Sequence, residues 1–331
     1  MSLRDRVAGT AATVALAGGV VAALTTATGV TFSAFAQQTA NPGSVISAAP
    51  DFRAPAVSST FIAKTIGGTA GAIKPAGTYY VYANVSDTGN PASGVSTVRA
   101  DLSSFDTGIT AAALTAGSFT AGGVAYGYRS ASLTADTPKA NGSYAYSLTA
   151  TDVAANTGTQ TGFAVTMDGT VPTAADVQTA NGGAIGGRPE LNDTITYTSS
   201  EPMDPNSILA GWTGATTDVV ARIDNNIVSG NDRLRVYNST NVTLLNFSSV
   251  NLGRLDYVTA NTTFGVTGTK AKMTMTGSTI TVVLGTQSAA GTTAAAAGTM
   301  CWTPAAGPTD PAGNALSLTA RSETGVADAD F

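Results

Sequence analysis

Short segments of alternating apolar and polar residues, separated by Gly, Asn and Asp, recur along most of this 331-residue chain. A strand points successive side chains to opposite faces of a sheet, so this alternation is typical of half-buried strands. Within residues 79–85, for example, Tyr79, Val81 and Ala83 alternate with Tyr80 and Tyr82. Strands spaced about 8–12 residues apart favour sandwiches or barrels. We therefore expect an all-β protein, with at least one of these tyrosines exposed.

The length suggests about two domains. We predict two tandem immunoglobulin-like β-sandwiches, with a short, stiff junction at Pro172, whose ring restricts the backbone. The expected organisation along the chain is a signal peptide at 1–36, a linker or N-terminal strand at 37–56, sandwiches at 57–171 and 172–322, and an acidic tail at 323–331 that frays.

The N-terminal segment has the pattern of an export signal. Arg4 and Arg6 precede a stretch without charged residues that extends to Pro50. Small residues at Ala34 and Ala36 fit the rule for signal cleavage. We predict secretion to the cell surface after cleavage at Ala36, with contact to the membrane only before cleavage. Cleavage after Ala34 and retention as an uncleaved anchor are the alternatives.

The composition limits both partners and chemistry. The net charge is −5 and the lysines and arginines are not clustered, which argues against nucleic acid as a partner. The chain has no His, so the usual general base, most zinc sites and every Ser-His-Asp triad are missing. We therefore predict a protein that is not an enzyme. A hydrolase or protease is the weaker alternative.

Several local structures can be predicted from turn and cap residues. Asn141-Gly142 is typical of a β-hairpin, and Gly277-Ser278 predicts a second one. Asp204 followed by Pro205 predicts the N-cap and first residue of a helical turn. The segment 242–248, VTLLNFS, is expected to be a strand.

One loop sequence occurs twice. The segments DVAANTG at 152–158 and DPAGNAL at 310–316 both place an Asn four residues after an Asp. An Asp carboxylate can accept hydrogen bonds from backbone N–H groups two or three residues later, while a Gly or Asn takes a left-handed conformation. We interpret the repeat as a turn that closes each sandwich, and a cation site is the alternative.

Acidic loop residues are the only candidates for a cofactor site, and no cofactor is otherwise predicted. Ca²⁺ takes six to eight oxygen ligands, which carboxylates and carbonyls can supply. One candidate set is Asp168 with Asp176, and the other is Glu201 with Asp204 and Asp310. The regular spacing of a calcium loop is missing from both sets.

Three segments resemble known bacterial families. The segment 29–49, GVTFSAFAQQTANPGSVISAA, resembles the signal region of camelysin-like and biofilm-fibre proteins. Residues 141–172 resemble the end of bacterial immunoglobulin-like domains, with Ala155 in place of the usual Gly. The segments 193–208 and 310–316 resemble the two ends of an S-layer-type immunoglobulin-like domain.

These resemblances imply a surface or matrix location of the Gram-positive type and two immunoglobulin-like sandwiches. Camelysins are described as metalloproteases, but a chain with no His and three Glu has no residues for that chemistry. We expect a non-enzymatic extracellular protein that contacts other surface or matrix proteins or copies of itself. The alternative is an adhesin or carbohydrate-binding module that uses exposed tyrosines and is stabilised by Ca²⁺.

Overall fold

The computed structural model describes residues 51–331 except 66–70, 227–229, 328 and 330. The predicted signal peptide and residues 37–50 lie outside this part of the chain. Strands make up 45% of the structure and helix is nearly missing, which confirms the all-β fold. Within the described residues, no helix has the length and apolar character needed to cross a membrane.

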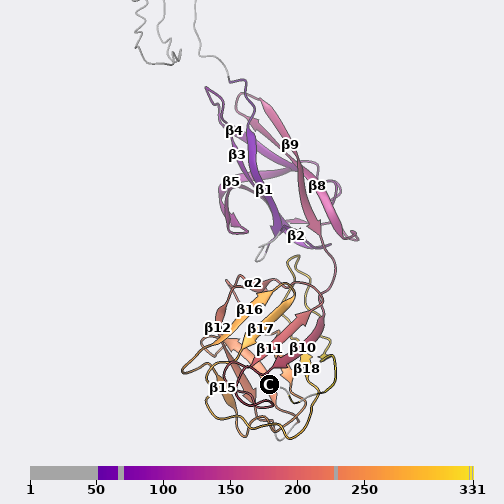
Figure 1. The fold of residues 1–331 in the computed structure, drawn as a ribbon. Helices are drawn as coiled ribbons and strands as arrows, with labels where there is room; N and C mark the ends of the chain where they lie inside the picture. The colour runs from indigo at the N-terminus through magenta and orange to yellow at the C-terminus, as the bar shows by residue number, and fades with distance from the viewer. Residues whose placement is uncertain (1–50, 66–70, 227–229, 328, 330) are drawn as a thin grey trace, which may run out of the picture.

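The first sheet forms an N-terminal lobe (Figure 1). Its hydrogen-bonded order is β1-β3-β6-β5-β4-β8-β9-β2, with β7 paired to β3. All pairs are antiparallel except β2 with β9. The strands are β1 (Ala56–Lys64), β2 (Ala72–Ile73), β3 (Thr78–Ser86), β4 (Val95–Asp101), β5 (Ala112–Ala121), β6 (Val124–Ser130), β7 (Leu133–Thr134), β8 (Gly142–Asp152) and β9 (Thr157–Met167).

The second sheet forms a C-terminal lobe. Its order is β10-β11-β17-β16-β12-β13-β14-β18-β19, with β15 paired to β12. The elements are β10 (Ala174–Ala180), β11 (Thr194–Ser199), α2 (Pro205–Ile208), β12 (Thr217–Asp224), β13 (Arg233–Asn238), β14 (Ser249–Asn251), β15 (Thr262–Phe264), β16 (Ala271–Thr276), β17 (Thr279–Val283), β18 (Cys301–Thr303) and β19 (Arg321–Ser322).

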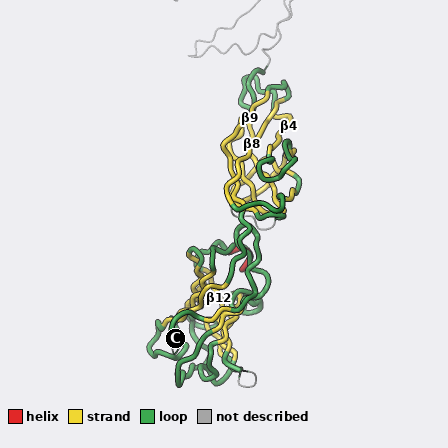
Figure 2. The backbone as a smooth tube through the Cα atoms, turned by 90° about the vertical axis from the view of Figure 1, so that its right-hand side faces the viewer, coloured by secondary structure: helices red, strands yellow, loops and turns green. Residues whose placement is uncertain are grey.

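Each lobe has its own apolar core, made only of residues from that lobe. In the N-terminal lobe, Tyr79, Val81 and Ala83 face the core together, as the alternation in β3 predicts. In the C-terminal lobe, the rings of Tyr197 and Trp302 meet edge to face, with centroids 5.4 Å apart. The lobes lie end to end along one long axis (Figures 1 and 2).

Two of the local predictions are confirmed. The Asp204 side chain caps α2 by accepting a hydrogen bond from the Asn206 N–H, and Pro205 is the first helical residue. Strands β16 and β17 pair around Gly277-Ser278, with Thr276 opposite Thr279.

Two other local predictions are wrong. Asn141 and Gly142 do not close a hairpin, because β7 pairs with β3 while Gly142 begins β8 opposite Met167. The Asn141 side chain instead binds the Gly169 N–H. The segment 242–248 is not a strand, because Leu245 and Phe247 are anchored in the core by turns rather than by a ladder.

The prediction that the acidic tail frays is also wrong for several of its residues. The Thr324 N–H donates to Asp176, and the Phe331 ring packs edge to face on Tyr257. Phe331 is 4% exposed. Its apolar surface stabilises this end of the chain against the core, an effect that the charges of the tail do not reveal.

Candidate cation site between the lobes

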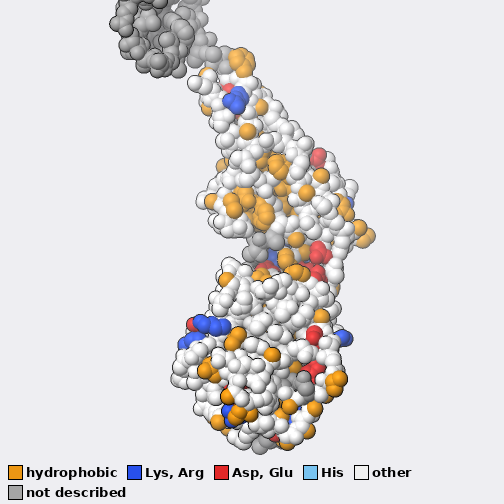
Figure 3. Space-filling view, viewed as in Figure 1, with side chains coloured by type: hydrophobic (Ala, Val, Ile, Leu, Met, Phe, Trp, Pro, Cys, Tyr) orange, Lys and Arg blue, Asp and Glu red, His pale blue; other side chains and the backbone are white. Residues whose placement is uncertain are grey.

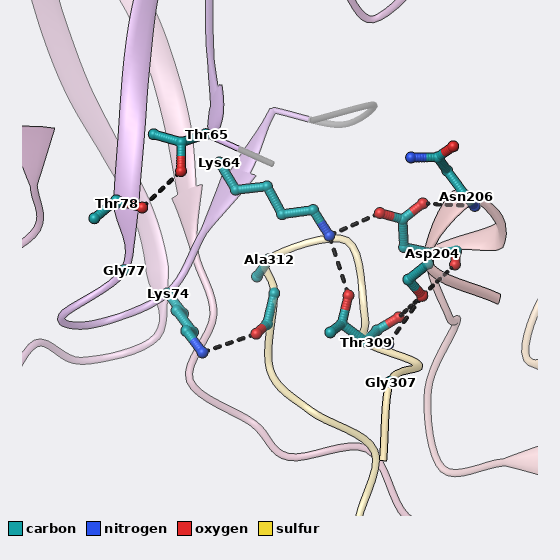
Figure 4. A pocket seen from close by; sticks show the side chains of 12 residues that line it. Lys64, Thr65, Lys74, Gly77, Thr78, Asp204, Asn206, Gly307, Thr309 and Ala312 are labelled. Atoms are coloured by element: carbon teal, nitrogen blue, oxygen red, sulfur yellow. Dashed lines mark hydrogen bonds and ion pairs between the residues drawn. The ribbon is translucent and has the colours of Figure 1, made fainter. Parts of the chain in front are cut away.

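The end of β1 and the turn after β2 meet the loops of the C-terminal lobe (Figure 4). Lys64 forms an ion pair with Asp204 at 2.7 Å and donates to the Asp310 carbonyl at 3.0 Å. Lys74 donates to the Gly313 carbonyl at 2.8 Å. The Asp204 carboxylate is nearly fully buried, with 1% of its side chain exposed. Two lysines of one lobe therefore hold the loops of the other beside a cleft of about 450 Å³.

Three predicted ligands gather at this junction. Asp168, Glu201 and Asp310 each place a carboxylate oxygen within 4.8 Å of the others. Asp168 ends the N-terminal lobe, Glu201 follows β11, and Asp310 belongs to the repeated loop. Among the described residues, the ion pairs include none of these three carboxylates. The cluster therefore concentrates negative charge between the lobes.

Glu201 is the least satisfied member of the cluster. Its Oε1 atom is buried and has no hydrogen-bond partner. Desolvation and the neighbouring charges of Asp168 and Asp310 raise the pKa of Glu201 above its usual value. A buried acceptor without a donor is costly, and each of these effects disfavours the ionised form. A bound cation would relieve all of them at once.

The repeated loop shows how Asp310 is held in place. Its Oδ1 atom accepts from the backbone N–H groups of Gly313 and Asn314, at 2.6 and 2.8 Å. Its Oδ2 atom accepts from the Asn314 side-chain amide at 2.7 Å. The same amide also donates to the carbonyl of Asp168. The motif is therefore a turn, as predicted, and it also ties the last segment of the C-terminal lobe to the end of the N-terminal lobe.

The first copy of the loop has the same hydrogen bonds between its Asp and its Asn. Asp152 accepts from the backbone N–H and the side-chain amide of Asn156, at 2.7 and 2.8 Å. That amide also donates to the carbonyl of Asp51. Ala155 adopts the left-handed conformation with φ +69°, where the second copy has Gly313 with φ +97°. Ala155, which stands where the domains that this segment resembles have Gly, therefore does not disrupt the turn.

A second acidic cluster lies at the far end of the N-terminal lobe and was missed as a candidate site. Asp51, Asp87 and Asp152 also bring carboxylate oxygens within 4.8 Å. The sequence contains a signal for it, because Asp51 precedes Pro55 by four residues, as Asp168 precedes Pro172. The loop that follows β3 supplies Asp87, in the position where the loop after β11 supplies Glu201.

The two clusters differ in how their oxygens are satisfied. Asp51 accepts from the N–H groups of Arg53 and Ser93, both at 2.9 Å, and these bonds lower its pKa. Asp87 accepts from Gly89 and Gly94. Backbone donors therefore already stabilise the ionised carboxylates at the far end, whereas Glu201 has no such donor. The junction is the better candidate for a cation.

The other two predicted ligands do not belong to this cluster of three carboxylates. Asp204 caps α2 and pairs with Lys64, so its charge is already compensated. Asp176 lies in β10, where it accepts from the Thr324 N–H and the Gln178 amide. The structure thus groups Asp168 with Glu201 and Asp310 rather than with Asp176.

No protein-family model matches the chain, and the comparison with curated proteins found no match.

Proposed function

We propose that this chain is an exported, non-enzymatic surface or matrix protein built from two tandem immunoglobulin-like β-sandwiches. It acts through contacts with other surface proteins or with copies of itself. The charged export-type N-terminus and the lack of His support this proposal. So does the end-to-end arrangement of two β lobes, which suits a spacer better than an enclosed catalytic pocket (Figure 2).

In this proposal, a divalent cation such as Ca²⁺ binds Asp168, Glu201 and Asp310 and stiffens the junction. The observation that carries it is the buried Glu201 Oε1, which has no hydrogen-bond donor, in a residue whose carboxylate lies beside those of Asp168 and Asp310. Hard cations prefer carboxylate oxygens, with waters and carbonyls completing the coordination. Binding to the folded state alone would raise the stability of the whole protein.

Thermal unfolding of the chain 37–331 in EDTA and in millimolar Ca²⁺ tests the cation. We expect Ca²⁺ to raise the melting temperature of the wild type, and Glu201→Gln to abolish most of the rise. Asp87→Asn in the far cluster is the matched control and should keep it. A wild-type melting temperature indifferent to Ca²⁺ contradicts the cation proposal, as does a full response in Glu201→Gln.

Light scattering after size-exclusion chromatography, with negative-stain microscopy, tests self-association in the same two buffers. Filaments or concentration-dependent oligomers support contacts between copies. A monomer at every concentration contradicts self-association and leaves other surface proteins as the partners.

A carbohydrate-binding module is a second candidate function. The observation that favours it is an aromatic cluster on the first sheet, outside the main core of the N-terminal lobe.

A further inference from the structure

A second group of aromatic side chains lies on the N-terminal lobe outside its main core. It contains Tyr82 and Tyr126, with Phe61, Tyr80 and Phe119 packed against them and only partly buried. The Phe61 and Tyr126 rings are nearly parallel, with centroids 6.4 Å apart. Hydrophobic side chains gather over β3 and β5 in Figure 3. This face therefore presents partly exposed rings to the surroundings.

Arg129 lies among these rings. Its guanidinium carbon is 4.3 Å from the centroid of Tyr80 and 4.4 Å from that of Phe119. Tyr82 is its direct partner across the β3–β6 pair. Within the described residues, none of the ion pairs includes Arg129, and its buried Nε atom lacks an acceptor. The positive charge of Arg129 is thus packed against aromatic rings, and no carboxylate of the described residues is paired with it.

The other lobe contains a similar stack in which the arginine does have hydrogen-bond acceptors. Arg222 lies 3.8 Å from the centroid of the Tyr237 ring. Its Nε atom donates to the Asn241 side chain at 2.7 Å, and its Nη2 atom donates to the Asn241 carbonyl. Packing against a tyrosine therefore does not by itself leave an arginine without acceptors. Because the Arg129 Nε atom is itself buried, an external acceptor would bind the terminal nitrogens of its guanidinium group.

The chemistry of this face defines the acceptor. Guanidinium groups bind carboxylates in a planar, two-pronged geometry. Aromatic faces pack against the apolar faces of sugar rings, as they do against other apolar surface. A chain of uronic acid sugars carries both groups on each residue, with the carboxylate attached directly to the ring. A neutral glycan offers only the apolar face of the sugar ring.

We propose that the face formed by Phe61, Tyr80, Phe119 and Arg129 binds an acidic polysaccharide, with a uronate carboxylate on Arg129 and the sugar ring on the neighbouring, partly exposed aromatics. This inference rests on the second candidate function and is independent of the junction cation.

Binding of polygalacturonate by the chain 37–331, measured by calorimetry in EDTA at low salt, tests the proposal. EDTA removes cations that could bridge the polymer to the acidic clusters. We expect polygalacturonate to bind at least tenfold more tightly than its methyl ester or dextran. We expect Arg129→Ala to lose at least tenfold in affinity and Tyr80→Ala to lose several-fold.

Arg129→Lys keeps the charge but not the two-pronged geometry, so it should bind at an intermediate level. Arg222→Lys in the stack of the other lobe is the matched control and should bind like the wild type. Melting temperatures of all variants show that they are folded. If Arg129→Ala fails to fold, the comparison of Arg129→Lys with Arg222→Lys still decides the question.

Three outcomes would overturn the proposal. Equal binding of dextran and polygalacturonate would leave a carbohydrate module without selectivity for acids. Binding of neither polymer would remove the carbohydrate function as well. Dimerisation that Arg129→Ala abolishes would show that a second copy of the chain covers this face.

Discussion

At the scale of single residues, the two copies of the acidic loop use different residues for the same left-handed backbone position. Ala155 and Gly313 both have positive φ, in the region where a Cβ atom is costly and glycine is favoured. Both turns form because Asp152 and Asp310 bind the same backbone and side-chain donors of the Asn four residues later. Side-chain hydrogen bonds thus stabilise a conformation that Ala alone disfavours.

This difference predicts a reciprocal pair of substitutions. Ala155→Gly should stabilise the chain by about 0.5–1 kcal/mol, because it relieves the strain of a left-handed alanine. Gly313→Ala should destabilise it by at least about 1 kcal/mol, since the new Cβ would also lie 3.4 Å from Lys64 Cδ. Urea denaturation measures both. If both substitutions changed the free energy of unfolding by the same small amount, the positive φ would not be a source of strain in either turn.

The raised pKa of Glu201 should make the stability of the folded chain depend on pH. Its folded pKa is raised, so ionised Glu201 destabilises the folded chain above that pKa. The penalty is relieved as the pH falls through the folded pKa, and below the ordinary glutamate pKa both states are neutral. In EDTA, Glu201→Gln should therefore melt about 2 °C above the wild type at pH 7 and level with it near pH 4. If the difference in melting temperature between Glu201→Gln and the wild type were the same at pH 7 and pH 4, ionised Glu201 would not be the cause of the destabilisation.

At the scale of elements, the alternation of apolar residues predicts strands well where they belong to long ladders. Strands β3, β8 and β11 lie where the pattern places them, because one of their faces is buried along most of its length. The segment 242–248 is just as apolar, yet it forms turns, because its core residues are held by single hydrogen bonds such as Leu245 to Val236. A short apolar run does not distinguish these cases.

The helical turn α2 was predictable for a local reason. Its cap is a side chain bound to the backbone two residues ahead, so sequence neighbours contain all the information. The Asn141-Gly142 hairpin failed for the opposite reason. The strand that pairs with Gly142 is β9, and that choice is made by long-range packing.

At the scale of the whole molecule, few contacts join the two lobes, and the lysines account for several of them. Lys64→Met removes the ammonium that neutralises buried Asp204, which should cost about 2–3 kcal/mol. Small-angle scattering should also show a wider range of lobe orientations. Lys272→Met is the control, because its pair with Asp218 is about half exposed and should be worth less than about 1 kcal/mol. Equal effects of the two variants would show that the buried pair does not fix the junction.

The sequence by itself determined the all-β class, most of the long strands, the cap of α2 and the repeated turn, because each depends on neighbouring residues or on a simple period. It also supplied Asp168, Glu201 and Asp310 as candidates. Only the tertiary structure grouped these three, assigned Asp204 to Lys64 and Asp176 to the C-terminal segment, and left the Nε atom of Arg129 without an acceptor. These features depend on which loops lie side by side in the folded chain and on which polar atoms have hydrogen-bond partners there. Contacts between residues that lie from ten to more than a hundred positions apart decide both, and no local pattern encodes them.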